Sequence, residues 1–249
     1  HMIRKFRIGV LVIILNFFAS VAMIWGQDNP SLLQMAVPSL NIAPDARGGG
    51  MGDMGAATLP DINSQYWNAA KYAFMGSKAG VSLSYTPWLR KLVNDVALVN
   101  MTGYYKLGNS DLQAISASLR YFSLGEVNIW ENIGDVPYGL NPYEMAFDVA
   151  YSRELSESYS MAVTLRYIRS DMGTDQNDES NAGNAFSADI SGYLEKYVLM
   201  GNAEALWSFG FNLSNIGSKI SYDGGNTNQY LPAKLTLGTG LLYPIDDYN

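Results

Sequence analysis

The chain has 249 residues, of which 48% are hydrophobic and 16% charged, and its formal net charge is −7 at pH 7. The charged share is below the roughly 25% of an ordinary soluble domain, and the acidic balance argues against a general affinity for nucleic acid phosphates. Because there is no cysteine and the one histidine is His1, disulfides, cysteine sites and a histidine-dependent triad or metal site are excluded from the fold.

Residues 1–26 have the parts of a secretory signal peptide. Three basic residues in the first seven positions precede an apolar run at 8–25, and the small residue Gly26 follows it. His1, ahead of a methionine, has the character of a cloning remnant. The alternative is an uncleaved helix, because the run approaches the length of a membrane span. We expect cleavage near Gly26 and export of an acidic protein.

The stretch 41–74, NIAPDARGGGMGDMGAATLPDINSQYWNAAKYAF, has the pattern of neither a helix nor a strand. Five glycines stand within eight residues, where they permit backbone conformations that strain other residues. Its aromatic and aliphatic side chains favour burial. We therefore expect 27–77 to form a short periplasmic arm at 27–40 and then a compact plug inside a barrel, where protein or lumen water satisfies irregular backbone. The residues assigned to the plug are Arg47, Gly48, Gly49, Gly50, Gly52, Trp67 and Asn68.

From about residue 78 the hydrophobic period changes to two, which is typical of strands with one apolar and one polar face. Eight such runs lie at 81–85, 95–107, 115–121, 145–152, 159–167, 186–195, 204–213 and 234–243. Runs of this length can cross a membrane at a tilt. We therefore predict an all-β fold, an antiparallel transmembrane β-barrel, with about eight strands at 78–249 forming a partial outer-membrane barrel.

The connections between the runs alternate in length. Those at 123–142, 170–184 and 215–232 are long, and the ones between them are short. Bacterial outer-membrane barrels have short periplasmic turns and longer outer loops. Starting from a periplasmic N-terminus, every long loop falls on the outside of a Gram-negative outer membrane. A β-sandwich would show the same alternation of residues but would not explain this asymmetry of loops.

Charged residues occur on the polar faces of the strands. On the lipid side an Arg or Lys near the midplane would cost about 2–4 kcal/mol, so we expect these charges to face the lumen and to pair with each other and with the plug. They are Arg120, Asp148, Arg166, Asp189, Glu195, Glu204 and Lys234. An eight-stranded barrel is filled by its own side chains, so a plug implies further strands beyond those present.

The plug stretch, the runs LQAISASLRYFSLGEV and YSMAVTLRYIRSDM, and the segments NLSNIGSKISYDGG and YLPAKLTLGTGLLY resemble the PorV-like outer-membrane proteins of the type IX secretion system, within the FadL-like barrels. The resemblance implies a FadL-type barrel of fourteen strands with an N-terminal plug. It also implies a non-enzymatic role in protein transport. Such proteins bind the C-terminal domain of secreted cargo at the translocon and pass it to a cell-surface sortase complex for attachment to lipopolysaccharide.

Aromatic and apolar residues of the long loops are the candidate cargo contacts, because exposed aromatic side chains often anchor protein partners. They are Trp130, Ile133, Val136, Tyr138, Tyr222 and Tyr230. Packing between loops or a place at the membrane interface is the alternative for each.

We expect no cofactor and no metal; carboxylates at 171–179 fit no standard calcium loop. Two other functions stay open, a FadL-like channel for small hydrophobic molecules and an envelope enzyme such as a lipid A deacylase.

Overall fold

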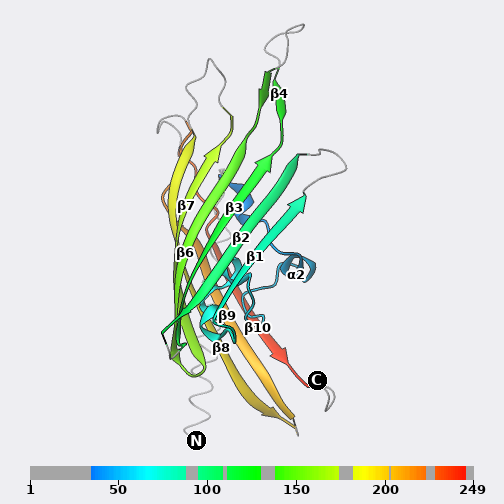
Figure 1. The fold of residues 1–249 in the computed structure, drawn as a ribbon, viewed down its shortest axis with the longest axis vertical. Helices are drawn as coiled ribbons and strands as arrows, with labels where there is room; N and C mark the ends of the chain where they lie inside the picture. The colour runs from blue at the N-terminus through cyan, green and yellow to red at the C-terminus, as the bar shows by residue number, and fades with distance from the viewer. Residues whose placement is uncertain are drawn as a thin grey trace, which may run out of the picture. The chain divides into compact units, whose positions relative to one another are not determined.

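The computed structural model describes residues 35–87, 95–108, 111–129, 138–173, 182–201, 203–222 and 228–244. Eight strands form one antiparallel sheet in the order β1-β2-β3-β6-β7-β8-β9-β10, which curves into a half-barrel (Figure 1). Their bounds are β1 Ala79–Pro87, β2 Val96–Leu107, β3 Gln113–Leu124, β6 Tyr143–Ser156, β7 Tyr159–Asp171, β8 Gly183–Met200, β9 Ala203–Gly217 and β10 Lys234–Leu242. The all-β antiparallel fold and all eight predicted strands are confirmed.

Two further strands lie inside a connection that the sequence patterns did not resolve. Val127–Ile129 (β4) and Tyr138–Leu140 (β5) pair with each other in a separate two-stranded sheet. They continue beyond the ends of β3 and β6 (Figure 1). Each has three residues, which is too short for an alternation of hydrophobicity to identify it.

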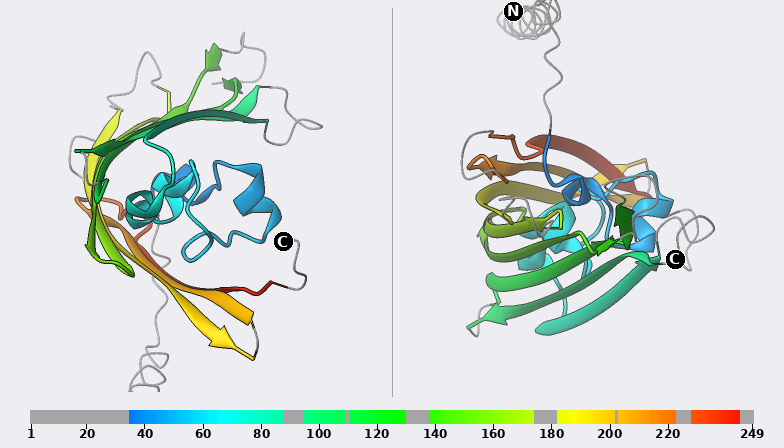
Figure 2. Two further views of the ribbon diagram at one scale, coloured as in Figure 1. Left: turned by 60° about the horizontal axis from the view of Figure 1, so that its bottom comes forward. Right: turned by 90° about the horizontal axis from the view of Figure 1, so that it is seen from above.

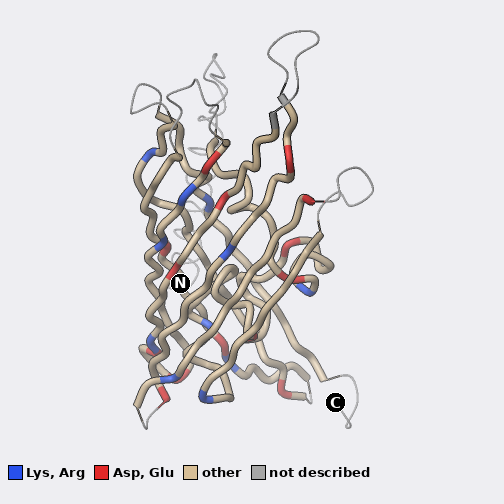
Figure 3. The backbone as a smooth tube through the Cα atoms, turned by 45° about the horizontal axis from the view of Figure 1, so that its top comes forward, with Lys and Arg blue, Asp and Glu red and all other residues tan. Residues whose placement is uncertain are grey.

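The two faces of the main sheet differ in polarity, as the two-residue hydrophobic period of the strands predicts. In β7, Ser160, Ala162 and Thr164 are buried on the concave face, while Val163 on the convex face is 51% exposed. Successive side chains of a strand point to opposite faces, so the convex face collects apolar residues and the concave face polar ones. Figure 3 shows how sparsely Lys, Arg, Asp and Glu are spread along the strands. An apolar exterior with a polar interior is the pattern of a barrel in lipid.

Residues 35–77, here called the inner segment, lie against the concave face (Figure 2). They contain four short helices, η2 Pro38–Asn41, α2 Ala46–Gly50, α3 Ser64–Trp67 and η3 Ala69–Phe74. The expectation that 41–74 is neither helix nor strand is therefore wrong for these short turns, which are too brief for a helical period to mark them. Within the described ranges, no helix is both long enough and apolar enough to cross a membrane. The inner segment contributes to two separate apolar clusters, one at each end of the sheet.

The first cluster lies at the end where the long connections join β3 to β6, β7 to β8 and β9 to β10, here called the long-connection end. Ala36, Val37 and Leu40 pack there against strand and loop residues that include Ile168 and Ile220. The predicted periplasmic arm included residues 35–40. These residues pack at the long-connection end, whereas the rest of the predicted arm lies outside the described residues.

The second cluster lies at the opposite end, here called the short-connection end. Tyr72 of η3 is fully buried and stacks on Tyr104 of β2, with ring centroids 4.9 Å apart. Alanines at inward positions of three adjacent strands, Ala114, Ala150 and Ala162, belong to the same cluster. Small side chains at these positions let η3 closely approach the eight-stranded sheet, here called the wall. A polar layer separates the two apolar clusters.

Candidate functional site

The glycine-rich part of the inner segment is organised around Trp67. The indole nitrogen of Trp67 donates to Oδ1 of Asp45 at 2.8 Å, and Oδ2 of Asp45 accepts the Gly48 backbone N–H at 2.7 Å and so caps α2. A Cβ at Gly48 or Gly55 would overlap the Trp67 side chain, whereas Gly50 has open space around it. Glycine is therefore required at residues 48 and 55, because the Trp67 side chain lies directly on the backbone there.

The other predicted plug residues at the start of this stretch have different surroundings. Gly52 has φ +75°, a conformation that favours glycine. Gly49 would meet an alanine side chain only at ordinary contact distance. Arg47 pairs with Asp61 at 3.0 Å on the surface, where ion pairs contribute little. Among the predicted plug residues at 47–52, only Gly48 has no room for a side chain, and the atoms that it would meet belong to Trp67.

Asn68 fastens the inner segment to the wall. Its side-chain nitrogen donates to the carbonyl of Gly192 in β8 at 2.9 Å and to that of Ala56 at 2.8 Å, and its oxygen accepts the Ala70 N–H at 3.1 Å. The Asn68 side chain is fully buried, so all three bonds form away from water. A Cβ at Gly210 of β9 would overlap the Ala56 carbonyl. The backbone at residue 56 therefore rests directly on the backbone of the strand.

A buried charge network occupies the polar layer. Arg166 of β7 pairs with Asp148 of β6 at 3.2 Å and with Asp189 of β8 at 2.8 Å. Asp148 also accepts a hydrogen bond from Gln65 of α3 at 2.5 Å, and Gln65 in turn accepts from Ser116 of β3 at 2.5 Å. The network joins four strands to the inner segment. Satisfied networks of this kind rigidify a core.

The predicted lumen positions of Arg120, Asp148, Arg166 and Asp189 are confirmed by their burial on the concave face. Burial does not confirm the other three predicted lumen charges, because Glu195 is half-buried, and Glu204 and Lys234 are exposed. Arg120 of β3 donates through Nη1 to the carbonyls of Ser39 at 2.8 Å and Ile42 at 3.2 Å. Its guanidinium carbon lies 4.6 Å from the centre of the Tyr66 ring, within the range of a cation–π interaction.

Lys71 of η3 is a buried cation that the sequence patterns missed. Its side chain is fully buried, and Nζ donates to the Gly55 carbonyl at 2.9 Å and to Thr58 Oγ1 at 3.1 Å. Burial lowers the pKa of the Lys71 ammonium from 10.5 to about 8, with nearby Asp61 opposing the shift. A lysine in a short irregular stretch carries no periodicity that would have marked it as buried.

The candidate cargo-contact residues lie at the long-connection end where they are described. Tyr230 is 48% exposed; its carbonyl accepts the Ala36 N–H at 3.0 Å, and its ring lies 4.5 Å from Nζ of Lys219. Tyr222 is half-buried and its hydroxyl donates to Ser170 at 2.9 Å. Tyr138 begins β5. Trp130, Ile133 and Val136 lie outside the described residues.

The family described as "Type IX secretion system protein PorV" matches residues 26–249. The chain belongs to the PorV family. The resemblance to PorV-like proteins that the plug and strand motifs indicated is therefore confirmed. Among curated proteins, no match was found. Membership implies a role in type IX secretion at the outer membrane, which agrees with the apolar convex face of the half-barrel.

Proposed function

We propose that this PorV protein is a non-enzymatic outer-membrane shuttle. It binds the C-terminal domain of secreted cargo at the type IX translocon and delivers it to the surface attachment complex. The match of the PorV family to residues 26–249 carries this proposal. In the same proposal, the strands belong to a FadL-type barrel whose long connections face the cell exterior, and the inner segment is its plug.

The inner segment covers the concave face, which favours cargo binding by the outer loops over passage of a ligand through the lumen. The inner segment is hydrogen-bonded to several strands of the wall, through Asn68, Gln65 and Ser39 among others. A cavity between the inner segment and the strands has a volume of about 30 Å³ and is lined mainly by polar side chains. A channel for small hydrophobic molecules needs a continuous apolar path, so we place the shuttle ahead of it.

Between Tyr222 and Tyr230, Tyr230 is the better candidate for cargo contact. Its ring is accessible at the long-connection end, whereas Tyr222 uses its hydroxyl and part of its ring within the protein. An aromatic residue that keeps an exposed face is suited to anchor a protein partner. The β4–β5 hairpin extends the same end of the sheet (Figure 1).

A pull-down of the full-length protein in mild detergent, with mass spectrometry of the bound material, tests the proposal. We expect exported proteins that share a C-terminal domain, and less of them with Tyr230→Ala. Tyr197→Ala is the matched control, because Tyr197 is 68% exposed near the short-connection end of β8.

The possible results separate the proposed functions. Recovery of a lipid-like ligand alone, with saturable uptake, would favour the channel. Absence of cargo together with intact secretion after loss of the protein would refute the shuttle. Equal cargo with both variants would remove Tyr230 from the contact surface while leaving the shuttle in place.

A further inference from the structure

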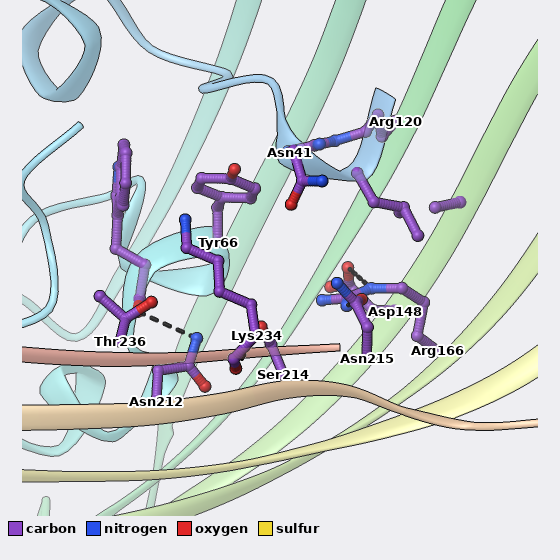
Figure 4. A pocket seen from close by; sticks show the side chains of 13 residues that line it. Asn41, Tyr66, Arg120, Asp148, Arg166, Asn212, Ser214, Asn215, Lys234 and Thr236 are labelled. Carbon is purple, nitrogen blue, oxygen red and sulfur yellow. Dashed lines mark hydrogen bonds and ion pairs between the residues drawn. The ribbon is translucent and has the colours of Figure 1, made fainter. Parts of the chain in front are cut away.

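The cavity beside the inner segment lies between side chains of several strands. Arg120 from β3, Arg166 from β7 and Lys234 from β10 line it together with Tyr66 of α3 (Figure 4). In this view the Lys234 side chain extends from its strand toward Tyr66. The volume of about 30 Å³ exceeds the roughly 10–15 Å³ needed for one water. It therefore has room for one small occupant.

The lining carries an excess of positive charge. Its cationic side chains are Arg120, Arg166 and Lys234, and the carboxylates on or directly paired with the lining are Asp148 and Asp189. Three cations against two carboxylates leave one positive charge in excess; of the three cations, Arg120 and Arg166 are buried and Lys234 is exposed at the rim.

Two cations of the lining have no acidic partner among the described residues: Arg120, which is buried, and Lys234, which is exposed to solvent. Arg120 is 5% exposed, and its hydrogen bonds go to the carbonyls of Ser39 and Ile42. In the part of the chain that the structure describes, no carboxylate lies within 4.0 Å of Arg120 or of Lys234. A buried cation that contacts only neutral groups is unfavourable unless an anion accompanies it.

We propose that this cavity binds a single small inorganic anion of about the size of chloride, held between Arg120 and Lys234. The amide side chains of Asn41 and Asn212 on the lining can donate further hydrogen bonds to it. The anion then bridges the inner segment, β3 and β10, so its binding stabilises the inner segment on the wall. This proposal does not depend on the identity of any cargo.

Thermal unfolding of the detergent-solubilised full chain tests the anion site. Sodium chloride is titrated against sodium gluconate at constant ionic strength, because gluconate is too large for the cavity. We expect the unfolding midpoint to rise saturably with chloride, since a ligand that binds only the folded state stabilises it. Bromide should replace chloride. Lys234→Gln should require about tenfold more chloride, as expected when one charged hydrogen bond is lost.

Lys196→Gln is the matched control, because it removes the same charge at an exposed position of β8. An equal midpoint in chloride and gluconate for the unchanged protein would overturn the proposal. So would an equal chloride response of the Lys234→Gln and Lys196→Gln variants. In crystals grown with bromide, an anomalous peak in the cavity would support the site, and water alone there would overturn it.

Discussion

Replacing Lys71 with methionine tests whether the inner segment holds a buried ammonium group. The ammonium is fully buried and donates to two neutral oxygens, those of Gly55 and Thr58. Its pKa falls from 10.5 to about 8 because burial disfavours the charge. The unfolded chain therefore binds more protons than the folded protein between these two pH values. It follows that the free energy of unfolding rises with pH across this window.

The size of the effect follows from the same two pKa values. Each pH unit between them contributes about 1.36 kcal/mol, so the rise from about pH 8 to about pH 9.5 adds about 2 kcal/mol from Lys71. Urea unfolding of the protein in lipid vesicles, followed by tryptophan fluorescence, measures it. Staying below about pH 9.5 keeps most tyrosines of the unfolded chain neutral.

The comparison of variants isolates the contribution of Lys71. We expect Lys71→Met to lose this pH-dependent increment, while Lys196→Met, at an exposed position of β8, keeps it. Parallel pH profiles of the unchanged protein and Lys71→Met would refute the reasoning. In that case the pKa of the Lys71 amine in the folded protein is not lowered from that in the unfolded chain. The absolute stability of Lys71→Met is a weaker test, because the substitution also leaves the Gly55 carbonyl without its donor.

Two further substitutions test how the inner segment is attached to the wall. Gly210→Ala should destabilise the protein by about 1–3 kcal/mol and make the inner segment more sensitive to limited proteolysis, because the new Cβ at residue 210 would overlap the Ala56 carbonyl. The control Gly76→Ala, at a position with open space around it, should change neither the stability nor the proteolysis. Asp148→Asn removes one carboxylate of the buried charge network and should lower the free energy of unfolding by about 3–5 kcal/mol. The control Asp53→Asn, on the exposed surface, should change the free energy of unfolding little. Equal effects of the two substitutions would show that the network does not stabilise the fold.

Much of the wall could be predicted from the order of residues. In β7 the alternation of Val163 with Ala162 and Thr164 identified both the strand and its faces. Successive side chains of a strand point to opposite faces, so a hydrophobic period of two residues indicates a strand. The charges Arg120 and Asp148 were placed on the polar face by the cost of exposing them to lipid. These inferences need only local spacing.

The attachment of the inner segment could not be predicted in the same way. Gln65 and Asp148 are 83 residues apart, and nothing in either neighbourhood indicates that they bond. The glycine cluster predicted a stretch without helices, whereas Gly48, Gly49 and Gly50 lie in the short helix α2. The sequence also did not show that Trp67 lies on Gly48 and leaves Gly50 in open space. Tyr230 was identified as an exposed loop aromatic, and its backbone pairs with the start of the inner segment.

The sequence by itself determined the eight strands, their faces, the alternation of short and long connections, and the resemblance to the PorV family. Each of these follows from neighbouring residues, because strand periodicity and turn composition are local. Only the tertiary structure decided which charges pair, which glycines lie under the indole of Trp67, and that Lys71 is buried. These depend on which parts of the inner segment meet which strands, and that register is set by packing between residues far apart in the chain.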